Sequence, residues 1–168
     1  MTKVAVVTGA AGGMGRAFVA ALMADGFEVV GMDLDAAGLA EVGDAQGAAF
    51  MPIEIDLTDA DAVTRAFGVV AQTCGGVDVL VNNAGTCLMT EFPDISATDF
   101  ARQMELNFST AFFCCQAAVP LMLAREGVKK IINISSNGAY NFDAFDPPPY
   151  RASKAALDTL TKDLARRY

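Results

Sequence analysis

Short runs of apolar residues alternate along the chain with longer amphipathic stretches. Each run has the length of a strand. The first, fourth and fifth are almost continuous valine, isoleucine and leucine, which is typical of parallel strands covered on both faces. The expected strands are Val4–Thr8, Glu28–Asp33, Ala48–Ile55, Val77–Asn82 and Lys130–Ser135.

The amphipathic stretches predict helices near 13–25, 58–73 and 97–125, and a last helix from Tyr150 to the end of the chain. This alternation predicts a single α/β domain over residues 1–168, a Rossmann-type doubly wound parallel sheet between two helical layers. Pro120 lies within the third helix, which we expect to be kinked or broken there. Phe108–Leu123 is apolar almost all round, which predicts burial on every side, in the core or against another subunit.

The composition narrows the class of protein. Apolar residues make up 53% of the chain and charged residues 19%, which favours a folded domain over a disordered one. A formal charge of −8 disfavours nucleic acid and anionic membrane surfaces as partners. We expect no membrane-spanning segment and, because the opening residues lack the layout of a secretory signal, a cytoplasmic location.

Histidine is absent, which excludes a serine–histidine triad and the usual histidine-rich metal sites. No metal is therefore expected, and any acid–base chemistry must use Asp, Glu, Lys, Tyr or Cys side chains. Cys74, Cys87, Cys114 and Cys115 do not form a C-x-x-C pair, and we expect reduced, buried thiols.

A glycine-rich turn, Thr8-Gly9-Ala10-Ala11-Gly12-Gly13-Met14-Gly15, joins the first strand to the first helix. Glycine allows the backbone to approach a ligand closely, and a helix N-terminus offers unpaired N–H groups to a pyrophosphate. Many tight turns share this composition, but its position between a strand and a helix favours a dinucleotide site.

Asp33 closes the second strand eighteen residues after Gly15, where a dinucleotide-binding fold carries an acid for the ribose hydroxyls. The alternative is a solvated acid in a turn. A carboxylate there repels a 2′-phosphate, and the neighbours Leu34 and Asp35 supply no positive charge. The sequence therefore predicts NAD as the cofactor, with NADP disfavoured.

Six motifs follow one another along almost the whole chain. They are Thr8-Gly9-x-x-x-Gly13-x-Gly15, Asp56-Leu57-Thr58-Asp59, Asn82-Asn83-Ala84-Gly85, Asn107, Ile134-Ser135-Ser136 and Tyr150-Arg151-Ala152-Ser153-Lys154. In this order they resemble the classical branch of the short-chain dehydrogenase/reductase family. Gly9, Gly12 and Gly15 also fit a G-x-x-G-x-x-G spacing, which resembles the extended relatives such as sugar-nucleotide epimerases and dehydratases.

The resemblance implies an oxidoreductase that interconverts an alcohol and a carbonyl by hydride transfer with NAD. It implies that the catalytic residues are Asn107, Ser136, Tyr150 and Lys154. It also implies a set of cofactor-binding residues. These are Gly9, Gly13, Met14, Gly15, Asp33, Asp56, Leu57, Asn83, Ala84, Gly85, Tyr150 and Lys154.

Tyr150 and Lys154 lie one helical turn apart, so their side chains share a face of the last helix. A free tyrosine has a pKa of about 10, and a nearby ammonium favours its ionised form. The resemblance gives Tyr150 the role of general acid/base, and places Lys154 at the nicotinamide ribose. It places Ser136 at the reacting oxygen, with Ser135 structural, and Asn107 at a water that relays protons.

The loop 137–149 is expected to shape the substrate site. Its aromatic residues wall a pocket or pack beneath the loop, and its acids are solvated or, if they face the pocket, disfavour anionic substrates. Three prolines stiffen the approach to Tyr150. The residues concerned are Tyr140, Phe142, Asp143, Phe145, Asp146, Pro147, Pro148 and Pro149.

Five strands are one fewer than a complete Rossmann sheet has, so we expect a fold that lacks its C-terminal strands relative to the family. The expected partners are a small alcohol or carbonyl substrate and further copies of the chain in a homo-oligomer. Two alternatives stay open. One is a catalytically silent, NAD-binding sensor or scaffold, and the other is an extended-type epimerase or dehydratase.

Overall fold

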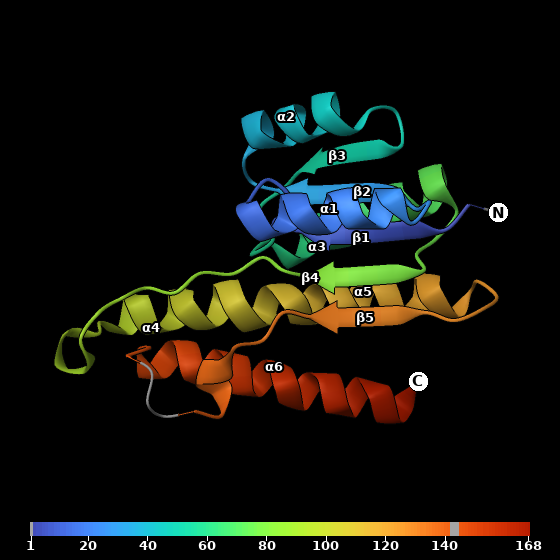
Figure 1. The fold of residues 1–168 in the computed structure, drawn as a ribbon. Helices are drawn as coiled ribbons and strands as arrows, with labels where there is room; N and C mark the ends of the chain where they lie inside the picture. Colours follow the sequence, from blue (N-terminus) through green and yellow to red (C-terminus); the bar gives the residue numbers. More distant parts are fainter. Residues whose placement is uncertain (1, 142–144) are drawn as a thin grey trace.

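Five parallel strands form one sheet in the order β3-β2-β1-β4-β5 in the computed structural model, which describes residues 2–141 and 145–168 (Figure 1). The first two strands have the predicted bounds, and the other three are shorter than predicted. Pro52 lies in β3, where its missing N–H is tolerated because β3 is an edge strand. The strands are β1 Val4–Thr8, β2 Glu28–Asp33, β3 Phe50–Glu54, β4 Val79–Asn82 and β5 Lys130–Asn133.

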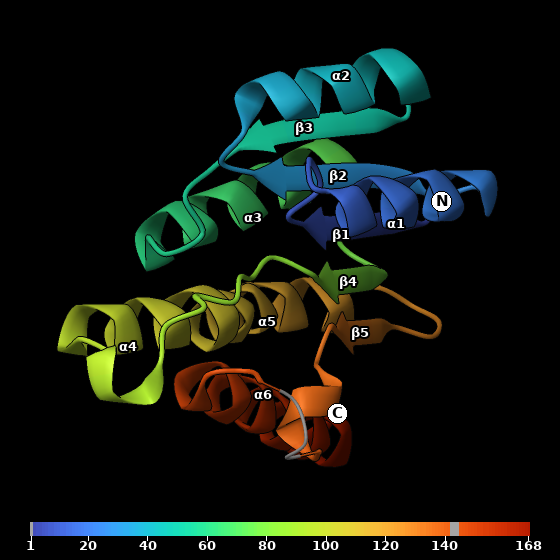
Figure 2. The same ribbon diagram turned by 60° about the vertical axis from the view of Figure 1, so that its left-hand side comes forward.

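Helices cover both faces of the sheet, as the predicted fold class requires (Figures 1 and 2). Side chains alternate along β1. Val4 and Val6 enter the core beneath α3, α5 and α6, whereas Ala5 and Val7 enter the core beneath α1 and α2. The helices are α1 Gly13–Ala24, α2 Ala36–Gln46, α3 Ala60–Cys74, α4 Ala97–Met104, α5 Thr110–Leu123 and α6 Pro148–Arg167.

Helix α2 was not predicted from the sequence. Its stretch is rich in alanine and glycine, so Leu39 and Val42 are the large apolar side chains that mark its buried face. A start signal was present, because the Asp35 carboxylate accepts a hydrogen bond from the backbone N–H of Gly38 at 3.0 Å and caps the helix.

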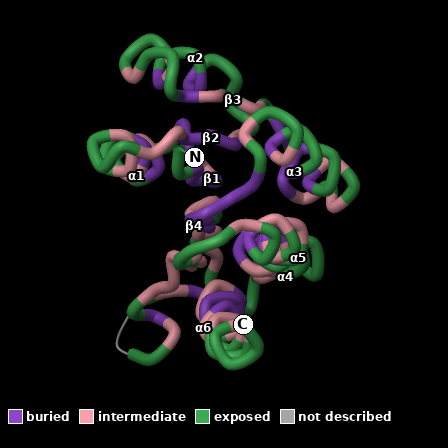
Figure 3. The backbone as a smooth tube through the Cα atoms, turned by 90° about the vertical axis from the view of Figure 1, so that its right-hand side faces the viewer, coloured by how far each residue is buried: buried purple, intermediate pink, exposed green. Residues whose placement is uncertain are grey.

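The predicted helix over 97–125 exists, but its interruption lies elsewhere than expected. A π-helical turn, Glu105–Ser109, joins α4 to α5, while α5 continues past Pro120 to Leu123 without a break. The expectation of a helix buried on every side is also wrong within this chain. Phe112 lies on an exposed face and Leu123 is 64% exposed, while the opposite face is buried (Figure 3). Contact with another subunit stays a prediction.

Length and composition alone would let the helical run Ala97–Leu123 cross a membrane, so the expectation that no stretch could do so is too strong. Its buried face, however, carries the polar residues Asn107 and Thr110 and packs against β4 and α3. A core helix of a folded domain meets the same length and composition test, and this helix has such a place.

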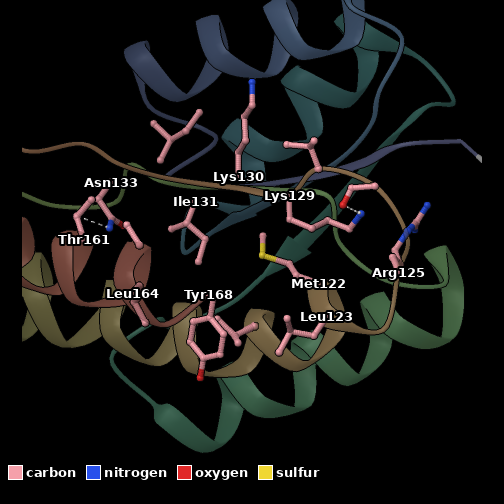
Figure 4. A pocket seen from close by; sticks show the side chains of 15 residues that line it. Met122, Leu123, Arg125, Lys129, Lys130, Ile131, Asn133, Thr161, Leu164 and Tyr168 are labelled. Carbon is pink, nitrogen blue, oxygen red and sulfur yellow. Dashed lines mark hydrogen bonds between the residues drawn. The ribbon is translucent and has the colours of Figure 1, made fainter.

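Strand β5 has no strand on its outer side among the described residues, which confirms the prediction of a sheet without its C-terminal strands. A groove of about 690 Å³ runs beside β5, between the ends of α5 and α6 (Figure 4). Ile131, Leu164 and Tyr168 contribute to its largely apolar lining. Tyr150 and Lys154 are not among the residues that line this groove.

The four cysteines are free of disulfides, as expected. Cys114 and Cys115 are buried, and burial raises their pKa values to about 12 and about 11, respectively. Cys74 and Cys87 are only half-buried, so the expectation of four buried thiols is wrong for these two.

Candidate active site

The strand order reverses between β1 and β4, because β2 and β3 follow β1 on one side and β5 follows β4 on the other. Open parallel sheets bind ligands in the crevice at the carboxyl ends of such strands. The glycine loop after β1, the segment after β4 and the first turns of α6 all lie toward this end of the sheet (Figures 1 and 2). The sequence-predicted residues are therefore brought to one edge.

The glycine loop has two positions that call for glycine and one that is open. A Cβ on Gly15 would overlap the carbonyl oxygen of Gly9 and lie 2.8 Å from the Cα of Ala10. Gly9 itself has φ +65°, a conformation that favours glycine. A Cβ on Gly13, in contrast, would meet nothing within 4 Å. The open space at Gly13 lies at the N-terminus of α1, where a phosphate group binds favourably.

Asp33 stands at the end of β2 and is already engaged with the backbone. One carboxylate oxygen accepts from the N–H of Ala11 at 2.9 Å, and the other accepts from the N–H of Asp35 at 3.0 Å. The sequence had suggested no cation nearby, but Arg16 reaches the same loop and donates to the carbonyl oxygen of Ala11 at 2.7 Å. An ion pair at 2.8 Å holds Arg16 to Glu41 on α2.

The predicted cofactor-binding segment after β3 divides into one exposed residue, Asp56, and one core residue, Leu57. Asp56 accepts from the hydroxyl of Thr58 at 2.7 Å and from its N–H at 2.9 Å, and these bonds hold the pKa of Asp56 below its usual value. Leu57 packs its side chain into the core beneath α3, so only its backbone can face a bound nucleotide.

The segment after β4 is hydrogen-bonded to the glycine loop. The side-chain amide of Asn83 donates to the carbonyl oxygens of Thr8 and Gly9, at 3.0 and 3.1 Å. The hydroxyl of Thr8 in turn accepts from the N–H groups of Asn83 and Ala84, both at 3.0 Å. Thr8 was noted only as part of a motif, but it links the two halves of the predicted cofactor site.

Asn107 is buried in the π-helical turn, and both ends of its side-chain amide are hydrogen-bonded. Its Oδ1 accepts from the N–H of Thr86 at 2.8 Å, and its Nδ2 donates to the Thr86 carbonyl at 2.8 Å and to Ser153 Oγ at 3.2 Å. A Cβ on Gly85 would lie 2.6 Å from Asn107 Oδ1, so glycine is needed there. Asn107 thus joins the segment after β4 to helix α6.

Gln103, one turn before Asn107, was missed from the sequence. It is buried, accepts from the N–H of Leu88 at 2.7 Å and donates to the carbonyl of Thr86 at 2.5 Å. A polar residue four positions before Asn107, on the same helical face, was a signal that could have identified it.

Tyr150 and Lys154 lie on the first turns of α6, as predicted. The Nζ of Lys154 stands 5.9 Å from the centre of the Tyr150 ring and donates to the carbonyl oxygen of Ile134 at 2.7 Å. Lys154 is only 5% exposed. This burial lowers the pKa of Lys154, while the negative charge of Asp158 opposes the shift.

Ser136 caps the short helical turn Asn137–Ala139, and its Oγ accepts from the N–H of Gly138 at 3.1 Å. Ser135 Oγ is buried without a hydrogen-bond partner among the described residues. Phe145 is 97% exposed and Tyr140 is 64% exposed, so neither forms the wall of an enclosed pocket. Phe142 and Asp143 lie outside the described residues.

The described residues fit a dinucleotide. The glycine loop leaves an open space at the N-terminus of α1, the carboxylate of Asp33 lies at the end of β2, and the buried ammonium of Lys154 lies at the end of β5. No group of three or more His, Cys, Asp or Glu side chains among the residues that the structure describes could hold a metal ion.

The sheet is of the Rossmann type, and the helix after β5 carries a tyrosine and a lysine on one face. These features place the protein among the dinucleotide-binding α/β domains. The sequence model of the short chain dehydrogenase family matches residues 3–168. The chain belongs to the short-chain dehydrogenase/reductase family.

Several named relatives are similar over nearly the whole chain. The galactitol 2-dehydrogenase of Agrobacterium fabrum is 34% identical, over 97% of this chain and 63% of its own length. The D-threitol dehydrogenase of Mycolicibacterium smegmatis is 36% identical, over 99% of this chain and 64% of its own. The chain therefore spans a little under two thirds of the length of these relatives.

Solved structures show the same fold. A short-chain dehydrogenase/reductase from Burkholderia xenovorans superposes with a TM-score of 0.91 at 32% identity, over 99% of this chain and 68% of that one. The ligand-free aldohexose dehydrogenase of Thermoplasma acidophilum superposes with a TM-score of 0.87 at 29% identity, over 99% and 62% of the two chains.

Proposed function

We propose that the chain forms the catalytic part of an NAD-dependent dehydrogenase that interconverts a hydroxyl and a carbonyl group on a small, sugar-like substrate. The family supports the reaction class, and the names of the galactitol and D-threitol dehydrogenases support the substrate class. The observation that carries the proposal is the buried ammonium of Lys154 beside the ring of Tyr150, at the carboxyl end of β5.

Tyr150 is the proposed general acid/base. In reduction, its hydroxyl gives its proton to the carbonyl oxygen of the substrate; in oxidation, the tyrosinate takes the proton of the hydroxyl group. Lys154 is almost fully buried and its ammonium lies 5.9 Å from the centre of the Tyr150 ring, so little water screens the charge that it holds beside the proposed acid/base. A bound nicotinamide supplies or accepts the hydride.

The other residues position this pair. Asn107 holds Ser153, the residue before Lys154, and the segment after β4, so it fixes the start of α6 against the sheet. The Ser136 hydroxyl is the proposed hydrogen-bond donor to the reacting oxygen. Its Oγ accepts from the N–H of Gly138, and this bond leaves the hydroxyl proton available to the substrate. Asp33, with the glycine loop, supports the choice of NAD over NADP.

Replacing Tyr150 with Phe tests the proposal. The variant keeps the aromatic ring beside Lys154 but lacks the hydroxyl that gives and takes the proton. We expect turnover of a polyol with NAD to fall about 100-fold or more. NADH binding, followed by fluorescence, should survive. Tyr168→Phe, at an exposed position distant from the site, is the matched control.

Near-normal turnover by the Tyr150→Phe variant would rule out the mechanism. NAD binding by the unmutated chain with no turnover across an alcohol and ketone panel would favour a silent NAD-binding relative. Turnover of a sugar nucleotide would favour an epimerase or dehydratase.

A further inference from the structure

Asp146 brings an unengaged carboxylate to the proposed substrate site. It is half-buried, and no residue that the structure describes hydrogen-bonds or ion-pairs with it. A Cβ placed on Gly138 would overlap Oδ2 of Asp146 and would lie 3.4 Å from Oγ of Ser136. The carboxylate of Asp146 and the hydroxyl of Ser136 therefore flank the same point.

The backbone around Asp146 is held on its C-terminal side. Pro147 and Pro149 are buried, and both line a small hollow together with Leu88 and Gln103. Proline fixes φ, so three prolines in a row give a stiff link from Asp146 to the catalytic Tyr150. A stiff link favours a defined role for the carboxylate over that of a freely moving surface acid.

A second segment faces this carboxylate. Cys87 follows β4, and both its burial and the negative charge of Asp146 raise the pKa of its thiol. Asp146 therefore lies where the segment after β4 and the loop after β5 approach each other, beside Ser136.

We infer that Asp146 is a specificity-determining residue that accepts a hydrogen bond from a substrate hydroxyl next to the reacting carbon, and so selects neutral polyols over hydroxy acids. An ionised carboxylate is a pure acceptor, and its hydrogen bonds with hydroxyl donors are among the stronger ones. The same charge repels a substrate carboxylate. The inference rests on the proposed dehydrogenase function.

Three substrates that share a secondary alcohol test the inference: 2,3-butanediol, 2-butanol and 3-hydroxybutyrate. In the Asp146→Asn variant we expect the ratio of kcat/KM for the diol to that for 2-butanol to fall about tenfold, because the charged acceptor is lost. We expect kcat/KM for 3-hydroxybutyrate to rise, which damage to the fold would not produce. Asp44→Asn, an exposed acid on α2, removes the same charge far from the site.

Binding of xylitol, measured by saturation-transfer NMR in the presence of NADH, gives a readout that does not need turnover. Binding that Asp146→Asn abolishes supports the inference even if the chain turns over no alcohol, in which case the proposed function alone fails. An unchanged diol preference, or unchanged xylitol binding, in Asp146→Asn overturns the inference. Absence of xylitol binding by the unmutated chain overturns it as well.

Discussion

The Nζ of Lys154 donates a hydrogen bond to the carbonyl oxygen of Ile134 across 2.7 Å, one residue beyond the end of β5. This bond ties helix α6, which carries the proposed acid/base, to the sheet and fixes the ammonium near Gly85 and the ring of Tyr150. It also holds the ammonium of Lys154 in a buried position. Burial disfavours the protonated form, so nearby negative charges are needed to keep Lys154 protonated.

Asp158 is the residue that we expect to keep Lys154 charged. It lies one turn further along α6, and its carboxylate also raises the pKa of Tyr140 through a hydrogen bond. Asp158→Asn removes an interaction that favours the ammonium, so the pKa of Lys154 should fall further. We expect the alkaline limb of the pH–rate profile to move to lower pH.

Rates measured between pH 6 and about 11 would show this shift. Asp163→Asn removes the same charge from an exposed part of α6, where the carboxylate pairs with Arg167, and should leave the profile in place. An alkaline limb at the same pH in Asp158→Asn and the unmutated chain would contradict the prediction.

Cofactor choice should depend on the charge of Asp33. The Asp33→Asn variant keeps one oxygen to accept from the glycine loop but no longer repels a 2′-phosphate. We expect the Kd for NAD to rise about tenfold, because a charge-assisted hydrogen bond is lost, while the Kd for NADP falls. Asp35→Asn is the control, since asparagine also caps α2. Tighter binding of NADP than of NAD by the unmutated chain would contradict the prediction.

Two glycines of the same loop should respond differently to alanine. In Gly15→Ala the new Cβ overlaps backbone, so we expect the free energy of unfolding to fall by about 2 kcal/mol. Gly13→Ala adds its Cβ to open space at the first residue of α1, so stability should hold or rise slightly while NADH binding weakens. Urea unfolding and NADH fluorescence separate the two effects. Equal destabilisation of both variants would show the loop geometry to be wrong.

Local sequence signals predicted most of the sheet and the positions of the main candidate site residues in the fold. Nearly continuous apolar runs marked β1 and β4, and the Tyr150–Lys154 spacing placed two reactive groups on one helical face. Helix α2 escaped because its two large apolar side chains, Leu39 and Val42, are too few to show a period. Tertiary packing decides such a segment, and a single sequence does not display it.

The interactions that the sequence did not predict are mostly those between distant segments. The side-chain amide of Asn107 bonds to Thr86 and Ser153, residues 21 and 46 positions away, and its role at a proton-relaying water stays a prediction. Pro120 predicted a kink or a break; the helix is not broken there, and the interruption of the helical pattern is the π-helical turn at Asn107. Such turns often occur at functional sites, but no residue type announces them.

Asp78 should make the fold sensitive to acid. Its carboxylate, 6% exposed, accepts from the backbone N–H of Val4 at 2.9 Å and pairs with Arg125 at 3.2 Å and Lys129 at 3.1 Å. Burial alone would raise the pKa of Asp78, but the Val4 hydrogen bond and the two cations outweigh it and hold the pKa below its usual value. The ionised form therefore stabilises the native state.

Because the native pKa is the lower one, this stabilisation is complete above the unfolded value of about 4 and is lost as the pH falls through the native value. In Asp78→Asn, Arg125 and Lys129 keep their charges without a carboxylate partner, and we expect the free energy of unfolding at pH 7 to fall by about 3 kcal/mol. Urea unfolding at pH 7, 5, 4 and 3 should show the two proteins converging as the pH falls. Asp163→Asn, which breaks an exposed pair, should change little at any pH. A constant difference between Asp78→Asn and the unmutated chain down to pH 3 would mean that Asp78 acts by shape and packing, and not by its charge.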